Sequence, residues 1–139
     1  MTTFEKGAEL TGRILIAALF LDAGIGKITG YAGTVGYMQS QGVPGALLPL
    51  VIALEVGGAL AIIAGYRTRM VAALLAGFSI VSALIFHSGA DQMQHILFMK
   101  NVAITGAFLL LIARGAGEWS LDARREARTA PGALLRRPS

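Results

Sequence analysis

Four long apolar runs constrain the fold of this chain more than any other feature of its sequence. They cover about residues 11–29, 46–66, 69–87 and 96–114. A helix of about 20 apolar residues spans the roughly 30 Å hydrocarbon core of a lipid bilayer. In the whole chain 55% of the residues are hydrophobic and 14% are charged, which is too apolar for an ordinary soluble domain. The sequence therefore predicts an all-α fold, an integral membrane four-helix bundle formed by residues 1–114.

The connections between the runs add detail to this prediction. The first, "GYAGTVGYMQSQGVPG", is rich in glycine and aromatic residues, and we expect a short interfacial helix over residues 34–41. The second contains only a few residues, so the second and third helices should form an antiparallel hairpin. After Arg114 the composition becomes polar and basic. Residues 115–139 are accordingly expected to form a basic tail outside the bundle.

The distribution of arginine predicts how the helices are oriented. Arg13 opens the first run, and Arg67 and Arg69 lie in the second connection, whereas the first and third connections contain no arginine. The arginines at and beyond the end of the fourth run are Arg114, Arg124, Arg125, Arg128, Arg136 and Arg137. Cytoplasmic loops of membrane proteins carry an excess of lysine and arginine. Both termini, the second connection and the basic tail are therefore predicted to be cytoplasmic.

Charge and cysteine content exclude several classes of function. The net charge is +4, and the excess lies in the tail beside the membrane, so we expect anionic lipid as its partner. No stacking aromatic residues accompany the basic cluster, so we predict no nucleic-acid binding. The absence of cysteine removes thiolate catalysis, disulfide exchange and iron–sulfur clusters. The two histidines, His87 and His95, are both expected at the outer rim, which argues against haem, and we predict no metal site.

Several polar side chains interrupt the apolar runs, and they form the candidate functional site. A charge at bilayer depth costs roughly 2.5 to 3.5 kcal/mol on insertion scales, so such residues usually face the bundle interior and pair with one another. The predicted topology places six of them in the outer half of the membrane, where we expect a polar pocket: Asp22, Lys27, Glu55, His87, Lys100 and Asn101. The alternative is structural: an ion pair that fixes helix register, a cap on a kink, or snorkelling near the interface.

Glu55 lies in the middle of "VIALEVGGALAIIAG" and must either have a partner or be protonated. Lys27 and Lys100 are the available cations. Because a lysine side chain can reach about one turn in depth, we predict that Lys100, together with Asn101, contacts Glu55.

Small residues suggest where helices approach one another closely. The second run carries a four-residue repeat of small residues, and the first carries three glycines near its outer end. These positions are Ala53, Gly57, Ala61 and Gly65 in the second run and Gly24, Gly26 and Gly30 in the first. Such residues let neighbouring backbones come close in membranes, so we expect close helix crossings at both sets.

The order and spacing of several short motifs resemble the DoxX family of small four-helix bacterial membrane proteins over nearly the whole chain. The motifs are Arg13 at the start of the first run, "GIGKITGY" with Lys27, "GVP", "LEVGGAL" with Glu55, "GYRTR", His87, "KN" with Lys100 and Asn101, and "GAGEWSLD". The resemblance implies a multi-pass protein of the bacterial plasma membrane. It also implies a relation to the small subunits of thiosulfate:quinone oxidoreductase and to membrane partners of soluble redox enzymes.

Two functions stay open at the level of sequence. In the first, the chain is a membrane subunit of a redox-associated complex, and its polar pocket binds a quinone head group or relays protons to it. A partner protein would then supply the electrons, because the chain carries no cofactor signature of its own. In the second, the chain is a non-catalytic adaptor or chaperone that recruits or assembles partner proteins. Both allow a homo-oligomer, and neither decides whether the chain is itself an enzyme.

Overall fold

The computed structural model describes residues 1–132, which form helices and turns without a strand. The elements are α1 (Thr3–Thr29), α2 (Tyr31–Ser40), a 3-10 turn η1 (Gly45–Leu47), α3 (Leu48–Ile52), a π-helical turn η2 (Ala53–Gly57), α4 (Gly58–Ala64), α5 (Thr68–Phe86), α6 (Gln92–Arg114) and α7 (Leu121–Thr129). Within the predicted tail, Arg136 and Arg137 lie outside the described residues.

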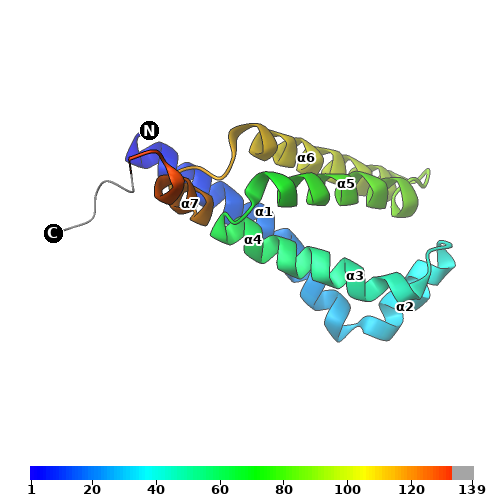
Figure 1. Ribbon diagram of the computed structural model, residues 1–139. Coiled ribbons are helices and arrows are strands. Elements are labelled where there is room, and N and C mark those ends of the chain that lie inside the picture. The colour runs from blue at the N-terminus through cyan, green and yellow to red at the C-terminus, as the bar shows by residue number, and fades with distance from the viewer. Residues whose placement is uncertain (133–139) are drawn as a thin grey trace.

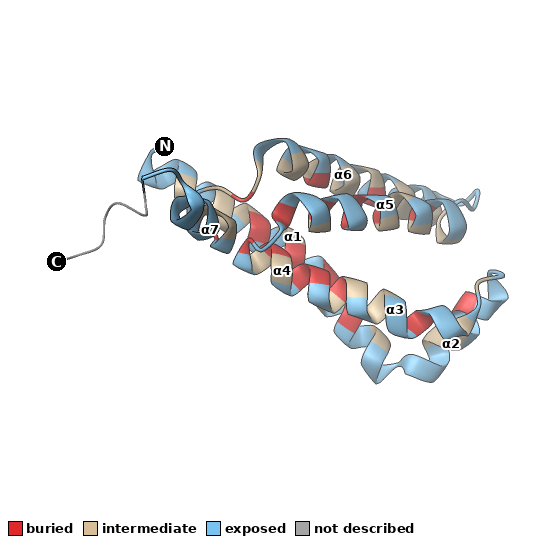
Figure 2. Cartoon of the chain, viewed as in Figure 1, coloured by how far each residue is buried: buried red, intermediate tan, exposed pale blue. Residues whose placement is uncertain are grey.

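The helices are arranged as two pairs. One pair is α1 with the segment η1–α3–η2–α4, and the other is α5 with α6 (Figure 1). Buried residues gather along the sides of α1, α4 and α5 that face one another (Figure 2). The central cluster consists of Ala17, Phe20, Ala59, Ile62, Ala72, Leu75, Ala76 and Phe108. Phe20 and Phe108 contact each other at a ring separation of 5.5 Å, which joins α1 to α6.

Three helical segments are long and apolar enough to cross a membrane. They are residues 45–64, 68–86 and 92–114, with mean hydropathies of 2.3, 2.1 and 2.1. α1 and α2 meet the same requirement when taken together, but they meet at a bend of 100°. Large apolar side chains on the outer surfaces of these helices, such as Leu50, Leu74 and Leu110, are exposed. In a bilayer such side chains contact lipid, so the fold is that of a multi-pass membrane protein.

Arg13 of α1 holds the carboxyl-terminal end of α4 in place. Its side chain is 1% exposed, and Nη1 donates hydrogen bonds to the carbonyls of Ile62 and Ile63 at 3.0 and 2.9 Å. Nη2 donates to the carbonyl of Trp119. The last carbonyls of a helix have no intrahelical partner, and a cation there also matches the negative end of the helix dipole. Arg13 thus joins α1, α4 and the segment after α6.

The residue after α4 is Gly65, and two constraints require a glycine there. Its φ of +68° lies in the left-handed region, which ends many helices and favours glycine. A Cβ at this position would also lie 2.4 Å from the Cβ of Ser120 and 2.7 Å from Nη1 of Arg13. Any side chain here would therefore displace both the arginine and the start of α7.

Asp122 connects the first turn of α7 to the start of α5. Its two carboxylate oxygens accept hydrogen bonds from the backbone N–H groups of Arg67 and Thr68 at 2.8 and 2.9 Å, and its own N–H donates to the carbonyl of Gly65. Ala116 and Ser120 are buried in the same region. The segment that follows residue 114 thus packs against the α4–α5 connection, and a helix, α7, follows it.

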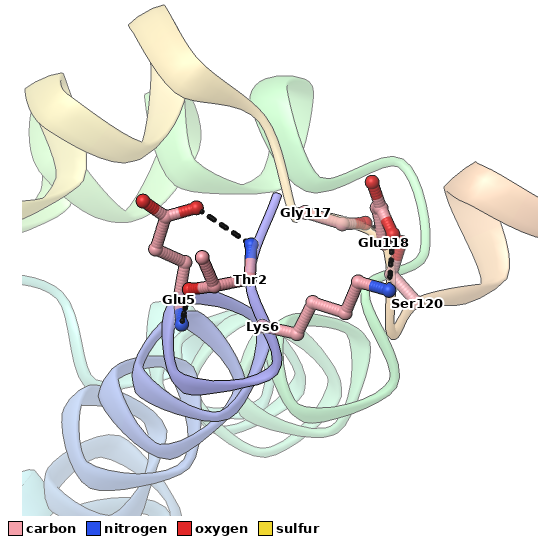
Figure 3. A network of polar contacts seen from close by, with 6 residues as sticks. All are labelled: Thr2, Glu5, Lys6, Gly117, Glu118 and Ser120. Carbon is pink, nitrogen blue, oxygen red and sulfur yellow. Dashed lines mark hydrogen bonds and ion pairs between the residues drawn. The ribbon is translucent and has the colours of Figure 1, made fainter.

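The amino terminus lies at this same end. Figure 3 shows Thr2 and Glu5 forming a reciprocal capping box at the start of α1, next to an ion pair of 2.9 Å between Lys6 and Glu118. The hydroxyl of Ser120 donates to the carbonyl of Gly117 and accepts from the N–H of Ala123 at the start of α7. The amino terminus, the α4–α5 connection and α7 therefore share one end of the molecule, and the α5–α6 connection lies at the other (Figure 1).

The small residues behave differently from the sequence expectation. Gly24 makes a close crossing, because a Cβ there would lie 2.6 Å from Cγ2 of Val56. Gly26 and Gly57 have open space around them, and Ala53 is exposed. Of the expected stripe along residues 53–65, Gly65 is closely packed, against Ser120 and Arg13, whereas Ala53 and Gly57 are exposed. The packed face carries Glu55, Gly58, Ala59 and Ile62, which recur at the 3–4–7 spacing of a helix face directed at the core.

Asp122→Ala should destabilise the protein by about 1 kcal/mol, the typical cost of removing a side chain that caps a helix N-terminus. Partial burial raises the pKa of Asp122, but the hydrogen bonds from Thr68 and Arg67 outweigh it and hold the pKa below its usual value. A carboxyl group with a depressed folded-state pKa stabilises the fold above its unfolded-state pKa. The difference between wild type and variant should therefore be complete at neutral pH and shrink as the pH falls below about 4.

Thermal unfolding in detergent across this pH range measures the difference. Glu126→Ala is the matched control, because it removes an exposed carboxylate from the same helix. Equal melting temperatures for the two variants at neutral pH would show that Asp122 does not stabilise the α5 terminus.

Candidate functional site

The candidate site is built around Glu55, a carboxylate that is 3% exposed inside an apolar segment. Glu55 is the middle residue of the π-helical turn η2, which interrupts the α-helical run between α3 and α4. Single π turns inside helices are uncommon and occur often at functional sites. The turn and the packed face that continues through Ile62 together direct Glu55 toward α1 and the core.

Lys27 of α1 is the partner of Glu55. Its Nζ lies 3.0 Å from both carboxylate oxygens, and the side chain is 28% exposed whereas that of Glu55 is 3% exposed. Gly24, one turn earlier on α1, permits this contact: a Cβ there would lie 3.3 Å from the Cβ of Glu55. The glycine brings the two backbones together so that the lysine side chain can reach the carboxylate.

The predicted contact of Glu55 with Lys100 and Asn101 is wrong. Asn101 donates from Nδ2 to the carbonyl of Ser79 at 3.0 Å, which ties α6 to α5. Within residues 1–132 Lys100 forms no ion pair. The reason lies in how the helices pair, because η2 packs against α1, whereas α6 packs against α5. Depth along the membrane normal does not determine which helix is the neighbour.

A cavity of about 140 Å³ lies beside the Lys27–Glu55 pair. Its polar lining residues are Lys27, Glu55, Ser79, Ser82, His87, Lys100 and Asn101. The remaining wall is apolar and includes Phe20, Phe78 and Ile104. Five of the six predicted pocket residues therefore surround one small space. Asp22 is the exception, because it is exposed and is not among the lining residues.

A larger groove of about 340 Å³ adjoins this cavity. The two spaces share Lys27, Glu55, Phe78, Ser82 and His87. The other lining residues of the groove come from α2, the α2–α3 connection, α3 and α5 and are mostly apolar, including Tyr37, Met38, Val51, Ile85 and Phe86. The rings of Tyr37 and Phe86 stack at 5.4 Å. An ion pair thus lies where a polar cavity meets an apolar, partly aromatic groove.

His87 stands at the end of α5 beside both spaces. Its Nδ1 lies 3.2 Å from Oε1 of Gln94 on α6, so the imidazole is held across the α5–α6 connection. With one ring nitrogen engaged, the other can donate or accept a proton according to tautomer. The site therefore combines a carboxylate, an ammonium group and an imidazole, which are groups suited to binding a polar head group and exchanging protons with it.

Sequence reasoning missed Tyr37, Phe86, Ser79 and Ser82. The aromatic residues of the first connection were visible as a compositional feature, but their position against α5 follows from the bend after α1. Among the described residues, no group of three or more His, Asp or Glu side chains is arranged to hold a metal ion. That the site works without a metal stays a prediction.

Comparison with known proteins places the chain in a family. The DoxX family model matches residues 8–88. "Inner membrane protein YqjF" of Escherichia coli is 51% identical over 123 residues, covering 88% of this chain and 95% of YqjF. The chain belongs to the DoxX family. "Inner membrane protein YphA" of the same organism is 40% identical, covering 87% of this chain and 96% of YphA.

A more distant relative of this DoxX protein is "Putative oxidoreductase CatD" of Bacillus subtilis, 26% identical over 118 residues, covering 79% of this chain and 87% of CatD. No solved structure matches the chain. The region matched by the family model contains Lys27, Glu55 and His87, whereas Lys100 and Asn101 lie beyond it. Together with the apolar helices, these relatives identify a multi-pass inner-membrane protein.

Lys27 and Glu55 should be energetically coupled, with an interaction energy of about 1 to 3 kcal/mol in a double-mutant cycle. Lys27→Met leaves a buried carboxylate without its cation, and Glu55→Gln leaves an ammonium group without its anion. The sum of the two single losses of stability should therefore exceed the loss measured for the double variant. Thermal or denaturant unfolding in detergent gives the four free energies.

Lys100→Met combined with Glu55→Gln is the matched cycle, because Lys100 lines the same cavity without pairing with the carboxylate. Its coupling should be close to zero. Coupling to Lys100 that exceeded the coupling to Lys27 would contradict the observed pairing.

Proposed function

We propose that this DoxX protein is the membrane subunit of a redox-associated complex and binds a quinone head group at the Lys27–Glu55 pair. The observation that carries the proposal is the position of this ion pair at the junction of the polar cavity and the apolar groove. A quinone combines two carbonyl oxygens with an apolar ring. The oxygens match the ion pair and the polar cavity, and the ring matches the apolar groove. The groove volume of about 340 Å³ lies within the range of small-molecule sites.

The residues of the site suggest separate roles in binding. Lys27 has three donors and is the more exposed member of the pair, so it can donate a hydrogen bond to a quinone carbonyl. Tyr37 and Phe86 form an aromatic wall against which a ring can stack. Val51, Ile85 and Met38 supply apolar surface for ring substituents or the first part of an isoprenoid tail.

Reduction of a quinone to a quinol consumes two electrons and two protons. Glu55 and His87 line the same space and can hold and pass protons toward the two oxygens. The electrons would come from a partner protein, because the sequence carries no cofactor signature of its own. The name "Putative oxidoreductase CatD" and the similarity to that protein support a redox role for the present chain.

Quinone retention tests the proposal. Protein purified in mild detergent from its own membrane should carry quinone that organic extraction and mass spectrometry detect. Glu55→Gln and Lys27→Met should each reduce the quinone per protein by about tenfold, the effect of losing a charge-assisted hydrogen bond. Asp22→Asn is the matched control, because it removes an exposed carboxylate from the same helix as Lys27 and should leave the quinone content unchanged.

The alternative, a non-catalytic adaptor, predicts a different result. A stable protein partner without bound quinone, retained equally by wild type and Glu55→Gln, would contradict quinone binding and favour the adaptor. Native mass spectrometry of the protein extracted in its own lipid reports proteins and small molecules together, so one preparation distinguishes the two functions.

We also propose that the protein crosses the inner membrane four times with both termini in the cytoplasm. The shared end of the amino terminus, the α4–α5 connection and α7 carries Arg67, Arg69, Arg114 and the arginines of α7. The positive-inside rule then makes this end cytoplasmic. The bent pair α1–α2 would supply the fourth span, with α2 folded back at the outer interface and residues 115–139 forming the cytoplasmic tail.

Cysteine labelling checks this topology, and the natural absence of cysteine makes a clean background. A cysteine at Ala90 or Gly36 should react with a membrane-impermeant maleimide in intact cells, because both positions are exposed at the proposed outer end. A cysteine at Ala130 should react only after the membrane is opened. The reverse labelling pattern would invert the proposed orientation.

A further inference from the structure

A second hollow region lies at the opposite end of the molecule from the Lys27–Glu55 site. It consists of two spaces that share Arg114 and Gly115. One is a cavity of about 490 Å³ at the polar end, beneath α7. The other is an apolar groove of about 460 Å³ between α1 and α6. A polar cavity thus continues into an apolar groove.

The polar cavity has more cationic than anionic lining. Four arginines line it: Arg67, Arg69, Arg114 and Arg125. None of them forms an ion pair within residues 1–132. Arg67 is directed at the ring of Tyr66, 5.7 Å away, which leaves the other three guanidinium groups available. Arg69 lies directly against Gly115, so a Cβ there would be 3.3 Å from its Nε.

The carboxylates of the cavity offset the charge of these arginines only in part. Glu118 pairs with Lys6, as Figure 3 shows. Asp122 accepts hydrogen bonds from two backbone N–H groups and also attracts Arg125. Glu126 is the remaining carboxylate and, like the four arginines, is exposed. The cavity is therefore suited to an anion that accepts several hydrogen bonds, and guanidinium groups bind phosphate oxygens in bidentate geometry.

The groove between α1 and α6 is almost entirely apolar. Its walls are formed by Gly12, Ile16, Ala107, Leu110 and Leu111, with Arg114 at the end nearest the cavity. A further hollow of about 370 Å³ shares Ile16 and Ala107 with it and continues along the same two helices to Lys100. From Arg114 to Lys100 α6 rises about 21 Å. One leaflet of the hydrocarbon core is roughly 15 Å deep, so the groove is long enough for an acyl chain.

Arg13 and Glu9 also line the groove, and the two charges attract each other. The side chain of Arg13 is 1% exposed, and its terminal nitrogens donate to backbone carbonyls of α4 and to the carbonyl of Trp119. Its Nε and Oε2 of Glu9 are enclosed atoms without a hydrogen-bond partner, so neither is open to a ligand in the groove. The groove therefore supplies apolar contacts, and the cavity supplies the polar ones. A phosphate followed by an acyl chain is the order found in a phospholipid.

We infer that this region binds one anionic phospholipid, with its phosphate among Arg69, Arg114 and Arg125 and an acyl chain in the α1–α6 groove. The charge of the cavity and its continuity with the apolar groove favour a lipid over a free anion, which would leave the groove unused. The site is separate from the proposed quinone site and does not depend on it. In the proposed topology the lipid belongs to the cytoplasmic leaflet.

Lipid titration followed by native mass spectrometry tests the inference. Phosphatidylglycerol and phosphatidylcholine with identical acyl chains are the probes, since they differ in net charge. The wild-type protein should bind one phosphatidylglycerol at least about tenfold more tightly than phosphatidylcholine. Arg114→Gln and Arg69→Gln should each remove most of this preference. Arg124→Gln is the matched control, because it removes an exposed arginine of α7 that does not line the cavity.

A second pair of measurements tests the acyl chain. Ala107→Phe fills the groove and should weaken phosphatidylglycerol binding without affecting the thermal stability of the lipid-free protein by more than a few degrees. Inorganic phosphate at millimolar concentration should not displace the lipid. Each variant is first compared with wild type by thermal unfolding, and Arg69→Gln replaces Arg114→Gln if the latter does not purify as a folded protein.

Three results would overturn the inference. Equal affinity for the two lipids, which carry the same phosphate and differ in head-group charge, would mean that the site does not select an anionic lipid. Full displacement by inorganic phosphate, with no effect of Ala107→Phe, would identify a free-anion site. A dimer that carries no lipid and dissociates in the Ala107→Phe variant would identify the groove as an interface between two copies of this chain.

Discussion

A charge inside a bilayer must be paired or hydrogen-bonded, and this requirement accounts for the arrangement of α1 against the rest of the protein. α1 carries two of the buried or partly buried cations, Arg13 and Lys27, which are separated by about 21 Å along its axis. Arg13 satisfies the terminal carbonyls of α4 and the carbonyl of Trp119, and Lys27 neutralises Glu55. Arg13 contacts the end of α4, and Lys27 contacts Glu55 of η2. These two contacts fix the register of α1 against the η2–α4 segment at both ends.

The close approach at Gly24 makes the second of these contacts possible. Without a Cβ, α1 can lie against Val56 and the backbone of η2, and Lys27 is then one turn away from the carboxylate. The π-helical turn contributes from the other side by holding Glu55 at the junction of two hollow spaces. Gly24, Lys27 and Glu55 are each unfavourable in a membrane helix when considered alone. In the folded protein they take part in one interaction.

The two ends of the molecule differ in chemistry. The end containing His87 offers an ion pair, an imidazole and an aromatic groove. The end containing α7 offers several arginines that form no ion pair within residues 1–132, beside an apolar groove. Membership of the DoxX family is established by the family match and by the E. coli relatives, and it leaves the ligand of either end open. Fold and family do not by themselves determine an activity, so the proposals for a quinone and for a phospholipid rest on the geometry of each site.

The sequence by itself determined that the chain is helical, apolar enough for a membrane and a member of its family. These properties follow from the length of the apolar runs and from the order of short motifs, which need no knowledge of neighbours in space. It also predicted that Lys27, Glu55, His87, Lys100 and Asn101, with Asp22, would surround one polar space, because polar groups in an apolar span tend to face the bundle interior. All of these except Asp22 line one cavity. Only the tertiary structure decided which of them touch. The prediction that Lys100 pairs with Glu55 used depth alone, whereas the identity of the neighbouring helix depends on side-chain packing between helices distant in sequence. The same reason explains why the exposure of Asp22, the aromatic wall of Tyr37 and Phe86, and the capping of α5 by Asp122 could not be predicted: each depends on which surfaces of α1, α2 and α7 meet the rest of the protein.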